Sequence, residues 1–141
     1  MSAGGEEVSR IVIAQRIRNR IIEYLEIASS FEEQLEYQAA APIAHVAAEM
    51  INQWEDWVRD PNDAFFAEPV FSQAEQDAIK DFNSVWDSVA DDTPDPLPEV
   101  SVLMETEPWQ RLREAAARAL EVFRRRGKFD EETEAFPQKR E

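Results

Sequence analysis

The 141-residue sequence predicts an all-α protein, a single-domain antiparallel bundle of four to five helices. Three observations support this fold class. Apolar residues recur at steps of three and four along most of the chain, which is the spacing of one face of an α-helix. Two Ser-x-x-Glu sequences precede apolar runs, as they do at helix N-termini. No stretch alternates polar and apolar residues for long enough to predict a strand.

The first two predicted helices are joined directly. Residues 9–28 carry a stripe of isoleucine and leucine that is wide enough to meet neighbours on two sides. Residues 30–41 form a short second helix, which begins at the capping box Ser30-Phe-Glu-Glu33 and ends before Pro42.

The third predicted helix, residues 43–59, has the clearest amphipathic pattern in the chain. Residues 60–63, Asp-Pro-Asn-Asp, have the composition of a turn. The loop at residues 64–71 that follows carries Phe65 and Phe66. Such a pair either folds back as a lid on the core or stays exposed as a binding feature, and both interpretations remain open.

The fourth predicted helix begins at a second capping box, Ser72-Gln-Ala-Glu75. Residues 90–98 contain three prolines at alternate positions, which favours an extended crossing. Residues 100–104 are either a short helical turn or an apolar strap. The last helix starts near Thr106 and ends at Gly127, which suits the position after a helix C-terminus.

The predicted domain spans residues 9–128, between a flexible N-terminus at residues 1–8 and a charged, disordered tail at residues 129–141. The first residues lack the basic and apolar regions of a signal peptide, and no apolar run is long enough to span a membrane. The absence of cysteine fits a reducing compartment. We therefore expect the protein in the cytoplasm.

The net charge of −15 lies entirely in the middle of the chain. Residues 28–99 carry 17 acidic and 2 basic residues, whereas the segments before and after them are each neutral. A negative field of this kind repels nucleic acid and anionic membranes and speeds the docking of basic proteins. We therefore expect no nucleic-acid or membrane partner, and we expect a basic protein partner.

Few residues of the types that carry catalysis or bind cofactors are present. There are three glycines, none in a loop that suits phosphate, and the only histidine is His45, so phosphate-binding loops and standard zinc sites are not predicted. We expect no cofactor. One polar face of the third helix could gather metal ligands, but we interpret it as a solvated face. Its members are His45, Glu49, Asn52 and Asp56.

One acidic motif suggests an enzymatic alternative. Glu32-Glu33-Gln34-Leu35-Glu36 resembles the Glu-Glu-x-x-Glu element of the all-α nucleoside triphosphate pyrophosphohydrolases, the MazG-like group. The second element of that family is Glu-x-x-Asp. Its nearest match in this chain is Glu49-Met50-Ile51-Asn52, where asparagine replaces the aspartate. The resemblance implies a magnesium-dependent phosphohydrolase. Its metal ligands would be Glu32, Glu33, Glu36 and Glu49.

Protein recognition is the function that the sequence favours. Nine of the fourteen aromatic residues fall within residues 28–99, and aromatic anchors in an acidic field suit an interface for a basic protein. In size, acidity and helical content the chain is similar, at class level only, to immunity proteins and antitoxins that neutralise basic toxins. The predicted contact residues are Tyr37, Glu55, Asp56, Trp57, Asp63, Phe65 and Phe66.

A further alternative is a structural or adaptor subunit of a larger assembly. The wide apolar stripe of the first helix would then face a partner or a second copy. Ile11 and Ile22 widen that stripe beyond the core-facing positions.

Overall fold

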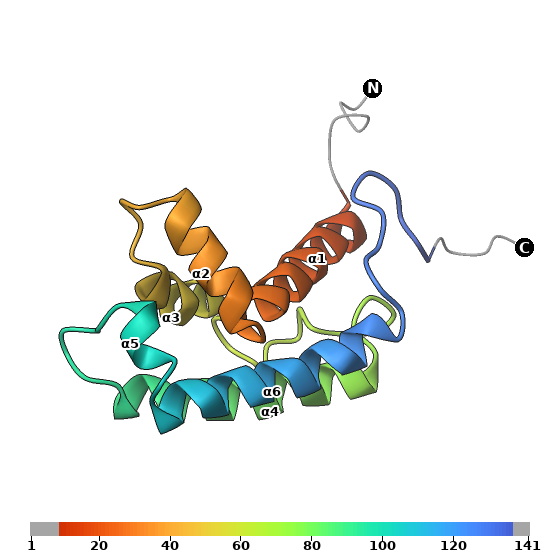
Figure 1. Ribbon diagram of the computed structural model, residues 1–141. Coiled ribbons are helices and arrows are strands. Elements are labelled where there is room, and N and C mark those ends of the chain that lie inside the picture. The colour runs from red at the N-terminus through yellow and green to blue at the C-terminus, as the bar shows by residue number, and fades with distance from the viewer. Residues whose placement is uncertain (1–8, 137–141) are drawn as a thin grey trace, which may run out of the picture.

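The computed structural model describes residues 9–136, which form a helical bundle (Figure 1). Residues 1–8 and 137–141, where a flexible N-terminus and the end of a disordered tail were expected, lie outside the described residues. The predicted all-α class is confirmed. The helices are α1 (Arg10–Ala28), α2 (Phe31–Ala40), α3 (Val46–Trp57), α4 (Gln73–Asp92), α5 (Val100–Leu103) and α6 (Glu107–Arg124).

The most extensive helix pair is α4 with α6. They run antiparallel, since Arg111 near the start of α6 pairs with Asp92 at the end of α4, 2.8 Å away. Figure 1 shows this pair along one side of the bundle, with α1, α2 and α3 on the other. Within residues 9–136, no helix combines the length and the apolar character that crossing a bilayer requires.

Serine caps begin the helices where the sequence predicted them. At the start of α2, the Ser30 hydroxyl accepts the backbone N–H of Glu33 at 3.1 Å. At the start of α4 the capping box is complete: Ser72 accepts the N–H of Glu75 at 3.2 Å, and the Glu75 carboxylate accepts the N–H of Ser72 at 3.0 Å. Beyond α6, Gly127 takes a φ of 74°, the left-handed conformation that glycine adopts without strain.

The start of α3 was predicted too early. The helix begins at Val46 rather than at residue 43, because the side chain of Gln38 organises the preceding turn. Its amide donates to the Ala44 carbonyl at 2.6 Å and accepts the N–H of Val46 at 3.1 Å. Ile43, the first residue of the predicted helix, is consequently fully exposed.

Residues 100–104, for which the sequence allows either a short helical turn or an apolar strap, contain the single helical turn α5. Its side chains Val100 and Leu103 are buried, whereas Val102 points to solvent. Two buried positions three residues apart are too few for periodicity to assign so short a segment.

Three aromatic rings from different helices meet at the centre of the core. Trp54 packs edge-on against Phe82 with ring centroids 4.6 Å apart, and Tyr24 lies 5.5 Å from Trp54. Each polar group on these rings has a partner: the Tyr24 hydroxyl donates to the Met50 carbonyl at 2.6 Å, and the Trp54 indole donates to Asn83 at 2.8 Å. The core therefore buries rings without leaving their polar atoms unpaired.

Gln34 connects three helices through one buried amide. Its nitrogen donates to the carbonyls of Ile27 and Ala28 at the end of α1, at 3.0 and 3.2 Å. Its oxygen accepts the indole N–H of Trp109 in α6 at 2.9 Å. Because the amide satisfies the last carbonyls of α1, the chain can turn sharply into α2.

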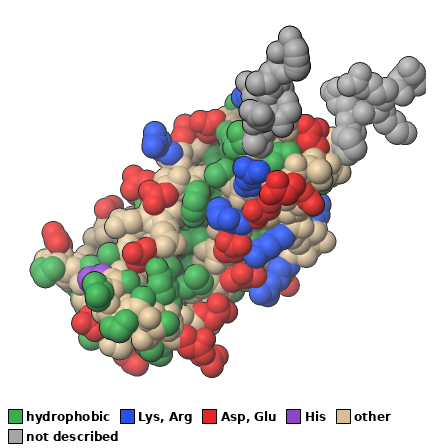
Figure 2. Space-filling view, turned by 90° about the horizontal axis from the view of Figure 1, so that it is seen from above, with side chains coloured by type: hydrophobic (Ala, Val, Ile, Leu, Met, Phe, Trp, Pro, Cys, Tyr) green, Lys and Arg blue, Asp and Glu red, His purple; other side chains and the backbone are tan. Residues whose placement is uncertain are grey.

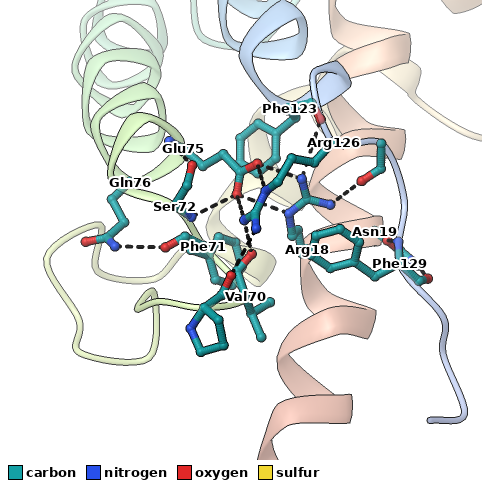
Figure 3. Close-up of polar contacts among 12 residues, drawn as sticks. Arg18, Asn19, Val70, Phe71, Ser72, Glu75, Gln76, Phe123, Arg126 and Phe129 are labelled. Carbon is teal, nitrogen blue, oxygen red and sulfur yellow. Dashed lines mark hydrogen bonds and ion pairs between the residues drawn. The ribbon is translucent and has the colours of Figure 1, made fainter. Parts of the chain in front are cut away.

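A buried ion pair joins α1 to α4 (Figure 3). The side chains of Arg18 and Glu75 are 0% and 1% exposed, and the closest nitrogen–oxygen distance between them is 2.7 Å. Arg126, just beyond α6, adds a second guanidinium at 2.7 Å from the same carboxylate. Glu75 thus caps its own helix and binds two arginines from other parts of the chain.

Aromatic rings enclose the Arg18 guanidinium. It lies 4.0 Å from the ring centroid of Phe129 and 5.2 Å from that of Phe123, and it donates to the Gly127 carbonyl. Cation–π contacts of this kind are strongest where water is excluded. The cluster is closed and its charges are paired, so we interpret it as structural.

Residues 129–136, expected to belong to the disordered tail, instead lie along α1 as an ordered C-terminal strap. The side-chain amide of Asn19 donates to the Phe129 carbonyl at 2.8 Å and accepts its N–H at 3.0 Å. Gln15 fastens the next turn of the strap. It donates to the carbonyls of Asp130 and Thr133 and accepts the N–H of Ala135.

Candidate functional site

A hollow of about 490 Å³ at the C-terminal end of α3 gathers acidic, basic and aromatic side chains. It is formed by the end of α3, the loop that follows and the first residue of α1. Among the hollows on the described surface we select this one, because acids there lie beside partly exposed aromatic rings. Its lining residues are Arg10, Asp56, Trp57, Arg59, Asp60, Asp63, Ala64, Phe65 and Phe66.

The loop is shaped by two of its own aspartates. The Asp60 carboxylate accepts the N–H of Asn62 at 2.9 Å, and the Asp63 carboxylate accepts the N–H of Phe65 at 2.7 Å. Backbone bonds from Asp63 to Asp60 and from Phe66 to Asp63 close the same turns. Aspartate stabilises tight turns in this way, so the wall of the hollow is set by local sequence.

Of the two roles that the sequence allows for this pair, Phe66 is a lid on the core and Phe65 is exposed enough to contact a ligand. Phe66 is a lid residue: it is buried and packs edge-on against Phe71 with centroids 5.2 Å apart. Phe65 is half-buried and lies 5.4 Å from the Phe66 ring, at the rim of the hollow. Trp57 is also half-buried, so an indole and a phenyl ring both present surface to a ligand.

The charged residues of the hollow are all exposed: Asp56, Asp60, Asp63, Arg10 and Arg59. None of them forms an ion pair with another residue in the described range 9–136. Figure 2 shows no blue side chains around the histidine, which lies at the N-cap end of α3, whereas the hollow at the other end of α3 has Arg10 and Arg59 in its lining. The carboxylates therefore remain free to pair with an incoming cation.

Five of the seven predicted contact residues line this hollow, namely Asp56, Trp57, Asp63, Phe65 and Phe66. The other two do not. Tyr37 is half-buried against the core from α2, and Glu55 is exposed on α3 outside the lining.

Sequence reasoning missed four lining residues. Arg59, Asp60 and Ala64 belong to the same short segment, so a local scan of residues 56–66 would have found them. Arg10 could not be found in this way, because packing of α1 brings it from far along the chain.

The four acids of the proposed magnesium site are not gathered. Within residues 9–136, no group of three or more His, Asp or Glu side chains could hold a metal ion. Glu32 and Glu36 are exposed on α2, while Glu33 faces a different hollow beside Arg124. Glu49 accepts the side-chain amide of Gln53 at 2.7 Å. The arrangement gives no support to a phosphohydrolase centre on these residues.

The polar face proposed for the third helix is also incomplete. His45 lies at the N-cap of α3, before the helix proper, and its Nε2 is 3.0 Å from the Leu97 carbonyl. Its ring therefore links two loops.

The apolar stripe of α1 is not an open docking face. Ile22 is 3% exposed within the core, and Ile11 packs partly against it. Only Ile13, at 42%, presents substantial surface. The bundle itself uses these side chains, so the structure gives no support to α1 as an assembly helix through Ile11 and Ile22.

No protein-family model, no curated protein and no solved structure matches this chain. The geometry of the hollow and the charge distribution are therefore the features from which a function can be inferred.

Proposed function

We propose that this protein is a binding module that masks a basic protein partner, in the manner of an immunity protein or antitoxin, with the hollow after α3 as the docking site. The observation that carries the proposal is the meeting of three exposed carboxylates with two half-buried aromatic rings. A lysine or arginine side chain in this hollow would form ion pairs with the carboxylates and a cation–π contact with Trp57 or Phe65.

The wider charge distribution supports the same kind of partner. Residues 28–99 carry the net charge of −15, and the hollow lies inside that segment apart from Arg10. A field of this sign steers a basic protein toward the site and raises its association rate. Arg10 and Arg59 at the rim favour a partner that also places an acid beside its basic anchor.

Neutralising the hollow should slow association with the partner by about tenfold or more. The test variant is Asp56→Asn/Asp60→Asn/Asp63→Asn. Asparagine keeps the Oδ1 acceptors of both loop turns, so the charge changes while the loop shape remains. The protein and the variant are used to capture partners from a cell lysate at low salt, and association rates of the retained basic protein are then measured.

The matched control is Glu36→Gln/Asp87→Asn/Asp91→Asn, which removes the same charge from exposed acids outside the hollow. We expect the control to retain the partner with an association rate near that of the unmodified chain. Equal retention by all three proteins, or equal loss from both variants, would contradict a localised site. Either outcome would mean that partner binding depends on the net charge of the whole chain and not on the hollow.

A further inference from the structure

The outer face of the α4/α6 pair carries a groove of about 330 Å³ lined by these two helices and by Arg125, which directly follows α6. Figure 1 shows the pair at one side of the bundle, with the other helices on its inner side. Ala78, Ala115 and Ala119 lie along the groove beside Phe82 and Val122, so short side chains form much of its lining. Another helix could therefore approach closely.

The two walls of the groove carry opposite charge. Asp77 and Asp81 project from α4, whereas Arg118 projects from α6 and Arg125 from its C-cap. All four side chains are exposed, and none pairs with an opposite charge elsewhere in residues 9–136. In contrast, Arg111 near the start of α6 is already paired with Asp92 and Glu107.

This arrangement is complementary to itself. A two-fold axis parallel to the helices, placed over the groove, puts the α4 of each copy opposite the α6 of the other. This rotation shifts neither copy along the axis. Each acidic wall therefore meets the basic wall of the second copy at the same height at which it faces the basic wall of its own groove. We propose that the α4/α6 groove is the interface of a symmetric dimer of this chain.

The interface is separate from the hollow after α3 and does not depend on the proposed function. The dimer brings two chains of charge −15 together, so their long-range repulsion opposes it at low salt. Salt screens that repulsion more effectively than it screens charge pairs in contact. We therefore expect self-association to be stronger at about 0.15 M salt than at about 0.01 M.

Two complementary charge-reversal variants test the proposal by sedimentation velocity up to about 1 mM protein. Asp77→Arg/Asp81→Arg makes both walls basic, and Arg118→Asp/Arg125→Asp makes both acidic. Each variant alone should remain monomeric, because like charges then face each other. An equimolar mixture should form a heterodimer, since every basic wall then meets an acidic one.

The reversal Glu32→Arg/Glu36→Arg on α2 is the matched control and should dimerise like the unmodified chain. The neutralised hollow variant should also dimerise, so failure here is distinguishable from failure of partner binding. A monomeric unmodified chain at about 1 mM, dimers of either reversal variant alone, or a mixture that stays monomeric would each overturn the proposal. Circular dichroism confirms that the variants remain helical.

Discussion

Replacing Glu75 with leucine should destabilise the protein by about 3–5 kcal/mol, as expected when one partner of a buried ion pair is removed. The change leaves the Arg18 guanidinium, which is fully buried, without its carboxylate. It also removes the capping box of α4 and one anchor of Arg126. Urea unfolding followed by circular dichroism measures the loss.

Two further variants separate the buried charge from ordinary surface electrostatics. The double variant Arg18→Met/Glu75→Leu removes both charges and should recover much of the lost stability. Arg111→Gln breaks two ion pairs at the protein surface and should cost much less stability than Glu75→Leu. If Glu75→Leu proved no more harmful than Arg111→Gln, the cluster would not hold the bundle together.

Acid provides a second measurement of the same ion pair. Burial alone raises the pKa of the Glu75 carboxyl, but hydrogen bonds donated by Arg126, Arg18 and the Ser72 N–H hold the pKa below its usual value. The stabilisation is therefore complete above the unfolded-state pKa of about 4.3 and is lost as pH falls through the folded-state pKa. Below about pH 4 the unmodified chain should lose stability more steeply than Glu75→Gln.

Removing residues 129–141 with a stop codon after Lys128 should destabilise the bundle by about 2–4 kcal/mol. The deletion takes away the Phe129 ring that lies 4.0 Å from the Arg18 guanidinium. It also removes the hydrogen bonds that Gln15 and Asn19 make with the strap. Both amides are buried by the strap and return to water when it is absent, so the loss comes mainly from packing and from exposure of Arg18.

The point variant Phe129→Ala tests the strap without shortening the chain. It should reproduce about half of the truncation effect, since it removes the ring but keeps the backbone bonds to Asn19. Hydrogen exchange at the Phe129 and Ala135 amides reports the strap directly, because both N–H groups are bonded to α1 side chains. Unchanged stability of the truncated chain, together with rapid exchange at both amides in the full-length chain, would show that the strap is not an ordered part of the fold.

The helices were predictable because their signals are local. Periodicity and serine caps gave the positions of α1, α2, α4 and α6 to within a few residues. The start of α3 was missed because it depends on Gln38, whose amide holds the turn from the preceding helix. No periodic pattern contains that information.

The buried polar groups could not be predicted in the same way. Arg18, Asn19 and Gln34 occupy positions that a sequence pattern assigns to solvent, yet their partners come from distant segments. The strap shows the same limit, since its charged composition predicts disorder, whereas Gln15 and Asn19 bind its backbone rather than its side chains.

The candidate site was more accessible to sequence reasoning. Its acids and rings lie within residues 56–66, so their clustering is visible along the chain, and only Arg10 required the tertiary fold. The acids of the metal hypothesis could not be judged from the sequence in this way. A short acidic run on one helix does not determine what faces it, and within residues 9–136 Glu32, Glu33 and Glu36 belong to no group of three or more potential metal ligands.

The most direct test of the central claim is a titration of the ¹⁵N-labelled protein with a hexa-arginine peptide, followed by NMR at low salt. If the hollow is the cation-binding site, the largest shifts fall on the Trp57 indole and the amides of residues 58–60 and 62–66. Those shifts then disappear in Asp56→Asn/Asp60→Asn/Asp63→Asn and persist in the matched control. Shifts that instead follow the exposed acids of α4, or spread evenly over residues 28–99, would contradict the claim.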